Sequence, residues 1–115
     1  VPFRSGVNLC EGKKEPIIYY QQHTERKFLD ANEKSYADLR KYNGMVNGMF
    51  GGDESLHGNN PTQGSELCTA VEEMFTLENT LAITGDVSYA DHLERIAFNA
   101  LPAQVDENLT DRQYF

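Results

Sequence analysis

The chain has 115 residues, of which 24% are charged, and its formal net charge at pH 7 is -8. This length allows one domain with a modest hydrophobic core. The acidic balance argues against nucleic-acid binding, because neutralising phosphates requires clustered lysine and arginine side chains. The sequence contains no run of about eighteen apolar residues, so we expect no membrane-spanning helix.

The chain begins at Val1 and stops abruptly at Phe115, and we therefore expect it to be an excerpt from a longer protein. Its two cysteines, Cys10 and Cys68, do not provide a disulfide framework. Residue type alone predicts two reduced, buried thiols that pack as small hydrophobic side chains.

The first half of the chain predicts two helices followed by an irregular segment. A helix starts at Pro16, a residue that fits the first helical turn, and continues to Tyr20. A second helix covers Glu25 to Asn43, with apolar residues at helical spacing and Gly44 as its stop. Residues 44–64 carry repeated glycines and one proline, which predicts an irregular loop.

The second half predicts two further helices. One runs from Ser65 to Thr84 and ends at Gly85. Its predicted apolar side consists of Leu67, Val71, Met74, Phe75 and Leu81. The other runs from Ser88 to Leu101, where Pro102 ends it.

A weak internal repeat relates the two halves. Residues 23–34 align with residues 84–95 at an offset of 61, and each copy reads as a turn, an aromatic residue and an amphipathic helix. This pattern predicts an all-α chain of stacked helical hairpins. A small helical bundle or a tetratricopeptide-like array is the simpler alternative.

The irregular segment and the helix start after it combine acids, a histidine, amides and a thiol, which is typical of an active-site loop. Carboxylate and thiolate groups both ligate zinc, which makes Glu66 and Cys68 candidate ligands. Inside a helix, side chains two residues apart diverge by about 200°, whereas at a helix start both can turn the same way. With Ser65 as the N-cap, Glu66 takes the first helical position. The helix N-terminus should then lower the pKa of the Cys68 thiol. A capping glutamate beside a core cysteine is the alternative.

Asp53 and Glu54 are adjacent acids that form either a solvated turn or a general acid/base for glycosidic cleavage. The neighbouring carboxylate would raise the pKa of one of the pair, which helps that acid to stay protonated. The same loop supplies donors and acceptors suited to sugar hydroxyls, namely those of His57, Asn59 and Asn60.

Residues 51–54 with 58–68, residues 83–101 and residues 15–20 together resemble the β-L-arabinofuranosidase-like family, glycoside hydrolase family 127 and its relatives. The resemblance spans nearly the whole chain. It implies an (α/α)6 toroid built from helical hairpins, followed by β-rich domains. Residues 1–115 would then form part of the catalytic domain, with about two hairpins and the catalytic loop 44–64 between them.

The resemblance also implies a retaining hydrolase that acts on L-arabinofuranosides of plant-type glycans through a cysteine nucleophile. Glu66 and Cys68 match the zinc ligands of its E-x-C motif, and Glu54 matches its acid/base glutamate. Asp53 is the alternative acid/base, because the sequence separation between Glu54 and Glu66 is shorter than that between the corresponding glutamates of characterised arabinofuranosidases. The family's Cys-Cys pair, which includes the nucleophile, has no counterpart here, and Cys10 does not match it.

We therefore expect the remainder of the parent catalytic domain to supply the nucleophile and the other zinc ligands. The isolated chain should be inactive, with marginal stability or a tendency to associate. A bacterial enzyme of this kind would be secreted or periplasmic. The competing hypothesis is a non-catalytic helical-repeat module that binds a protein partner through its acidic surface.

Overall fold

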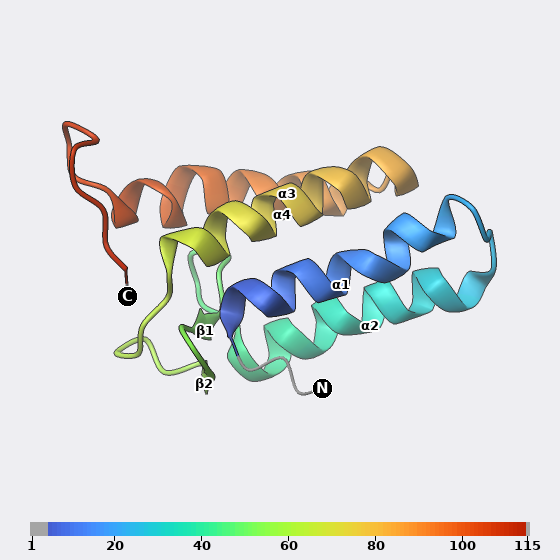
Figure 1. Ribbon diagram of the computed structural model, residues 1–115, viewed down its shortest axis with the longest axis horizontal. Coiled ribbons are helices and arrows are strands. Elements are labelled where there is room, and N and C mark those ends of the chain that lie inside the picture. The colour runs from blue at the N-terminus through green and yellow to red at the C-terminus, as the bar shows by residue number, and fades with distance from the viewer. Residues whose placement is uncertain (1–4, 115) are drawn as a thin grey trace.

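The computed structural model describes residues 5–114, which contain four α-helices arranged as two antiparallel hairpins (Figure 1). The helices are α1 (Gly6–Tyr20), α2 (Arg26–Asn43), α3 (Leu67–Thr84) and α4 (Val87–Arg95). A π-helical turn (Ile96–Ala100) and a 3-10 helix (Pro102–Gln104) extend α4. The predicted all-α class is confirmed, whereas closure into a toroid stays a prediction. No helix in the described range is long and apolar enough to cross a membrane.

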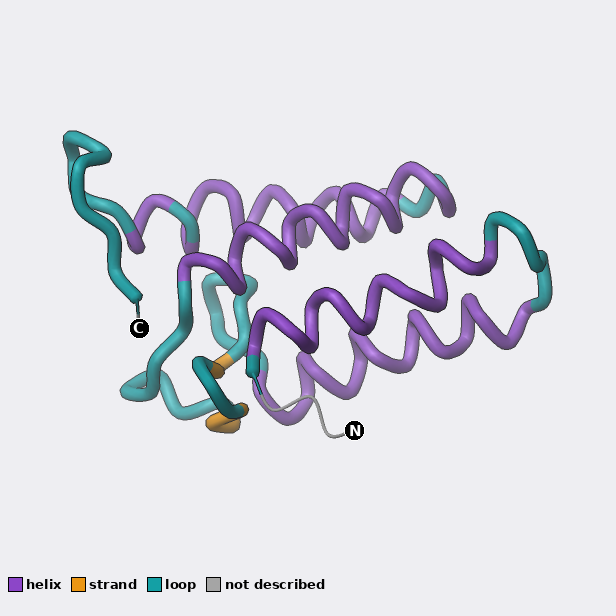
Figure 2. The backbone as a smooth tube through the Cα atoms, in the orientation of Figure 1, coloured by secondary structure: helices purple, strands orange, loops and turns teal. Residues whose placement is uncertain are grey.

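The two hairpins stack along their lengths, with α1 beside α3 (Figure 1). Both hairpin turns lie at one end of the molecule. The long loop between α2 and α3 lies at the opposite end, where α1 and α3 begin (Figure 2). The candidate active-site loop therefore sits over the N-terminal ends of two neighbouring helices.

The helix starts follow the internal repeat. Gly6 and Leu67, which open α1 and α3, differ by 61 positions, and so do Arg26 and Val87, which open α2 and α4. The predicted hairpins are thus confirmed. Gly85 ends α3 in the left-handed region, at φ 69°, which a glycine adopts without steric cost.

The start of α1 was predicted wrongly, because this helix begins at Gly6 and holds Pro16 in its interior. The buried residues of α1 are Gly6, Cys10, Lys13 and Ile17. They follow a helical spacing, but the lysine among them interrupts the apolar pattern. This lysine is buried because it pairs with an acid of a helix that is far away in the sequence, and a local pattern cannot reveal such a partner.

The apolar side of α3 was predicted only in part, because, of the residues assigned to it, Met74 and Leu81 do pack against the core. The residues that α3 buries are mostly polar, namely Thr69, Ala70, Glu73, Thr76, Leu77 and Thr80. Val71 and Phe75 are instead 53% and 50% exposed. Some of these polar groups have partners in α1, since Glu73 pairs with Lys13 and the Thr76 hydroxyl donates to the Cys10 carbonyl at 3.1 Å.

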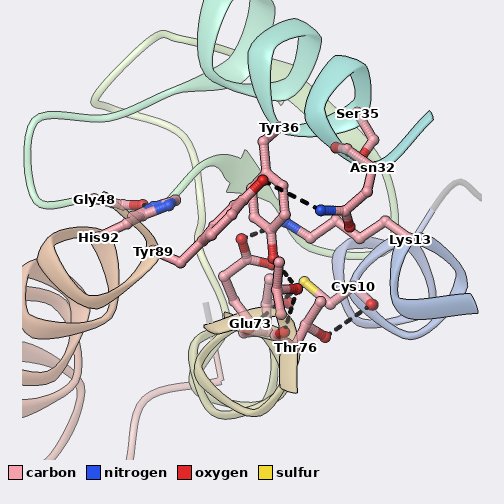
Figure 3. A network of polar contacts seen from close by, with 12 residues as sticks. Cys10, Lys13, Asn32, Ser35, Tyr36, Gly48, Glu73, Thr76, Tyr89 and His92 are labelled. Atoms are coloured by element: carbon pink, nitrogen blue, oxygen red, sulfur yellow. Dashed lines mark hydrogen bonds and ion pairs between the residues drawn. The ribbon is translucent and has the colours of Figure 1, made fainter. Parts of the chain in front are cut away.

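Polar contacts join the two hairpins at their centre (Figure 3). Lys13 forms a buried ion pair with Glu73, and its Nζ lies 3.7 Å from the centroid of the Tyr36 ring. Two hydrogen bonds connect the hairpins beside this pair, from Asn32 Nδ2 to Tyr89 Oη at 3.3 Å and between the hydroxyls of Tyr36 and Thr80 at 3.5 Å. Apolar clusters flank the network, one around Met49, Leu77 and Ile96 and another around Cys10, Leu39 and Phe50.

The segment 44–64 is more ordered than predicted, because it contains a small antiparallel pair of strands. These are β1 (Gly51–Gly52) and β2 (Leu56–Gly58), with a bulge between the two residues of β1. A Cβ atom on Gly51 would lie 2.5 Å from the carbonyl oxygen of Gly58. The strands can therefore approach this closely only because residue 51 is a glycine.

Candidate active site

Three hydrogen bonds fix the loop over the helix ends. The backbone N–H of Gly6, at the start of α1, donates to the carbonyl of Asp53 at 2.8 Å. Gly52 N–H donates to the Gly64 carbonyl at 3.0 Å, and Gly58 N–H donates to Asn43 Oδ1 at 3.0 Å. The acids at the loop tip are thus positioned by the start of α1, the end of α2 and the segment that leads into α3.

Glu66 and Cys68 converge at the start of α3, as their predicted position at a helix terminus requires. The Cys68 thiol donates a 2.8 Å hydrogen bond to Oε2 of Glu66. The helix begins slightly later than predicted, so Glu66 is the N-cap, while the Ser65 hydroxyl donates to the Phe50 carbonyl at 3.4 Å. The pair therefore shares one side of the helix start.

Burial distinguishes the two side chains. Glu66 is 2% exposed, and its Oε1 has no hydrogen-bond partner among the described residues, whereas Cys68 is exposed. A buried carboxylate oxygen without a partner, next to a reachable thiol, fits a zinc donor set. Within residues 5–114, no three histidine, cysteine or acidic residues gather closely enough to hold a metal. Glu66 and Cys68 can therefore supply only part of a coordination sphere.

The expected lowering of the Cys68 pKa is contradicted. Desolvation raises the pKa of this thiol, and the hydrogen bond and negative charge of Glu66 raise it further. The backbone N–H groups of Thr69 and Cys68 act in the opposite direction but do not prevail. Without a cation, the neighbouring carboxylate thus keeps the thiol protonated, and the thiol donates its proton to that carboxylate.

Asp53 is paired with a histidine of β2. Its Oδ2 lies 2.7 Å from His57 Nε2, and its Oδ1 accepts from the Ser55 N–H at 3.1 Å. This contact with His57 is the largest cause that lowers the pKa of Asp53. The predicted rise through a neighbouring acid therefore does not occur at Asp53, and this carboxylate stays ionised.

Glu54 is exposed and has a partner that the sequence did not suggest. The Tyr114 hydroxyl donates to Glu54 Oε1 at 2.8 Å. The hydrogen bond to Glu54, with the negative charges of Glu54 and Glu66, raises the pKa of Tyr114 to about 12. Tyr114 therefore contacts the candidate acid. No local motif marks this tyrosine.

The two asparagines proposed to bind sugar are exposed on the same loop. Asn60 Oδ1 accepts from the backbone N–H and the hydroxyl of Thr62, at 3.0 and 2.9 Å. His57 and Asn60 thus already have partners within the loop, and the Asn60 oxygen stabilises a turn. Sugar binding by His57, Asn59 and Asn60 stays a prediction.

Residues 13–115 match the family model described as Beta-L-arabinofuranosidase, GH127 catalytic domain. The chain belongs to this family. Neither a curated protein nor a solved structure matches it. The matched region of this GH127 chain contains all of the candidate site, from Asp53 to Tyr114. The chain is therefore part of a glycoside hydrolase catalytic domain, and its substrate class is carbohydrate.

Proposed function

We propose that this GH127 chain supplies the acid/base and two zinc ligands to a retaining glycosidase site for L-arabinofuranosides of plant-type glycans. Glu54 is the acid/base, and Glu66 and Cys68 are the ligands. The observation that carries the proposal is the convergence of Glu66 and Cys68 at the start of α3.

The contacts of the two loop acids favour Glu54 over Asp53 as the proton donor. Asp53 is held ionised by His57, and a general acid must carry a proton before cleavage. Glu54 would donate that proton to the glycosidic oxygen as the bond to the sugar breaks. In the second half of a retaining reaction, it would take a proton from the attacking water.

The nucleophile in this proposal is a cysteine of the parent domain, outside these 115 residues. Glu66 and Cys68 would hold zinc together with further ligands from that region. Bound zinc would keep cysteine sulfur in its thiolate form. The partnerless Oε1 of Glu66 supports a role in metal binding, since a buried carboxylate oxygen otherwise pays an uncompensated desolvation cost.

The test of Glu54 uses the intact protein that contains this chain, with L-arabinose release from arabinofuranoside-bearing glycans as the measurement. Glu54→Gln should lower kcat by about 100-fold or more, because general acid–base catalysis contributes at least that factor. Asp53→Asn is the matched control and should lower kcat less. Full activity in Glu54→Gln would overturn the assignment.

Zinc content of the purified intact protein tests the metal ligands independently of activity. Glu66→Gln and Cys68→Ser should each lose bound zinc, while Glu78→Gln, which alters an exposed acid of the same helix, should keep it. Unchanged zinc in both site variants would contradict the proposed ligands. An intact protein that releases no arabinose but binds a protein partner would favour the helical-repeat interaction module.

A further inference from the structure

The first residue of α1, Gly6, is buried where α1 meets both halves of the candidate site. One half is the loop that carries Asp53 and Glu54, and the other is the start of α3, where Glu66 and Cys68 converge. The separation of the two halves determines how the proposed acid faces the proposed metal ligands. A residue that contacts both halves can therefore affect the geometry of the whole site.

Gly6 contacts the loop through its backbone. Its N–H donates to the Asp53 carbonyl at 2.8 Å, one residue before the proposed acid. The preceding loop residue is also near, because a Cβ atom on Gly52 would lie 3.7 Å from Gly6 Cα. A shift at the start of α1 should therefore move the Asp53 peptide, and Glu54, which follows directly in the chain, should move with it.

Gly6 contacts α3 at Thr69, the residue that follows the proposed zinc ligand Cys68. A Cβ atom on Gly6 would lie 2.8 Å from Thr69 Oγ1 and 3.2 Å from Thr69 Cγ2. Thr69 is completely buried, and its β-branched side chain has few alternative rotamers in a helix, so it has little room to turn away. The start of α1 can therefore approach α3 this closely only because residue 6 has no side chain.

The rest of α1 is held against α3 further along the two helices. The Cys10 thiol donates to the Thr69 carbonyl at 3.7 Å, and the Thr76 hydroxyl donates to the Cys10 carbonyl at 3.1 Å. Beyond them, Lys13 pairs with Glu73. Because these contacts keep α1 from moving as a whole, an added side chain at its start would displace mainly the first turn.

The loop has a second attachment that would not follow such a displacement. The Gly52 N–H donates to the Gly64 carbonyl at 3.0 Å, and Gly52 also forms a bridge with Ser65. Gly52 is thus tied to the segment that leads into α3, whereas Asp53 is tied to α1. A displaced first turn would pull on Asp53 while Gly52 stays in place, which would reorient the segment that carries the proposed acid.

We propose that Gly6 is a positioning residue, which sets the distance between the acid loop and the metal-ligand end of α3 through its contacts with Asp53 and Thr69. The inference rests on the acid/base role proposed for Glu54. Alanine is a better helix former than glycine, so helix formation alone would favour alanine at this position. The close contact with Thr69, rather than the helix, therefore accounts for the glycine.

Steady-state kinetics of the intact protein on an aryl arabinofuranoside test the proposal. Gly6→Ala should lower kcat by about ten-fold or more and change KM by less than about two-fold, because a misplaced acid affects the transition state rather than substrate binding. Its zinc content should equal that of the original protein, since both proposed ligands lie at the start of α3. Loss of zinc, or a rise in KM as large as the fall in kcat, would overturn the positioning role.

Substitutions at Thr69 identify the contact. Thr69→Ala removes both atoms that a Cβ atom on Gly6 would meet. Thr69→Val is the matched control, because it keeps the shape of the side chain and removes a hydroxyl that has no hydrogen-bond partner among residues 5–114. Gly6→Ala should therefore lower kcat about ten-fold in the original and Thr69→Val backgrounds, but by less than about two-fold in the Thr69→Ala background. Equal losses in all three backgrounds would overturn the proposal.

The same assays distinguish this proposal from the proposed function. Full activity of Glu54→Gln would overturn the acid/base role and the positioning role with it. An unchanged kcat in Gly6→Ala beside a reduced kcat in Glu54→Gln would overturn the positioning role alone. If Gly6→Ala unfolds below the assay temperature, adding Thr69→Ala should restore the melting temperature, and a double variant that melts equally low would overturn the proposal.

Discussion

The hydroxyl of Tyr114 donates a 2.8 Å hydrogen bond to Oε1 of Glu54, although 60 positions separate the two residues. The C-terminal segment reaches the loop because it folds back after the 3-10 helix. Val105 forms a bridge with Arg112, and the Gln113 N–H donates to the Gln104 carbonyl at 2.9 Å. Tyr114 therefore fixes the orientation of the carboxylate that we propose as the acid/base.

Removing that hydroxyl should slow catalysis more than it weakens substrate binding. In the intact protein, Tyr114→Phe should lower kcat by about 10-fold with little change in KM, because a misplaced acid affects the transition state rather than the bound ground state. Steady-state kinetics on an aryl arabinofuranoside measure both constants. Tyr42→Phe removes the hydroxyl of another exposed tyrosine and serves as the control. An unchanged kcat in Tyr114→Phe would argue against a positioning role.

Among the contacts between the two hairpins, the buried ion pair of Lys13 and Glu73 should affect the free energy of unfolding most when it is mutated. Lys13→Met should lower the free energy of unfolding by about 3–5 kcal/mol, because it leaves the Glu73 carboxylate buried without its cation. The double variant Lys13→Met/Glu73→Leu should recover most of that loss. Urea unfolding followed by circular dichroism provides the measurement.

Lys34 and Asp38, an exposed pair on α2, provide the matched control for this experiment. Lys34→Met should change the free energy of unfolding very little, because solvent screens an exposed pair. A double variant as unstable as Lys13→Met would indicate that packing, rather than an uncompensated charge, accounts for the loss.

Acid should destabilise the fold through His92. Its Nε2 lies 2.6 Å from the Gly48 carbonyl oxygen, so the neutral ring donates its proton there, and burial lowers the pKa of His92. The unfolded chain binds a proton near pH 6.5, whereas the folded chain does so only at lower pH. The stabilising contribution is therefore complete above pH 6.5 and decreases as the pH falls towards the folded-state pKa.

Urea unfolding at several pH values tests this expectation. His92→Gln should be less stable than the original chain at pH 8, and its stability should vary less between pH 8 and about pH 5. His23→Gln, at an exposed histidine, should keep the original pH dependence. An identical pH dependence in His92→Gln and the original chain would exclude His92 as its source.

The sequence predicted the helices best where an apolar period coincides with a glycine stop, as in α2 and at the end of α3. It failed at α1, since Lys13 becomes a core residue only through Glu73 in another helix. It also assigned Val71 and Phe75 to the buried side of α3, because an apolar period does not reveal which side of a hairpin its neighbour covers. Both side chains are exposed in this chain.

Some features of the candidate site likewise follow from the local sequence, whereas others depend on residues that meet only in the folded chain. The convergence of Glu66 and Cys68 follows from a helix start, which proline, glycine and serine mark locally. The distinction between Asp53 and Glu54 depends on contacts with His57 and Tyr114, which only the folded chain specifies. The thiol pKa was predicted wrongly because desolvation and the nearby carboxylate outweigh the helix terminus.

The geometry of the β1–β2 pair should make two adjacent glycines respond differently to the same substitution. In Gly51→Ala, the new Cβ would lie 2.5 Å from the Gly58 carbonyl oxygen, a backbone atom, so the strands must separate. In Gly52→Ala, the nearest atom is Leu56 Cδ2 at 3.3 Å, and a side chain can move aside. Overpacking against backbone should cost about 1–3 kcal/mol of the free energy of unfolding in Gly51→Ala, and less in Gly52→Ala.

Because Asp53 and Glu54 follow β1 directly, separation of the strands should also displace the proposed acid. In the intact protein, Gly51→Ala should therefore lower kcat as well as the melting temperature, while Gly52→Ala should change both only slightly. Thermal melts and arabinose-release assays on the two variants provide the comparison. Equal losses in both variants would mean that the close approach of Gly51 to Gly58 does not hold the loop in its active position.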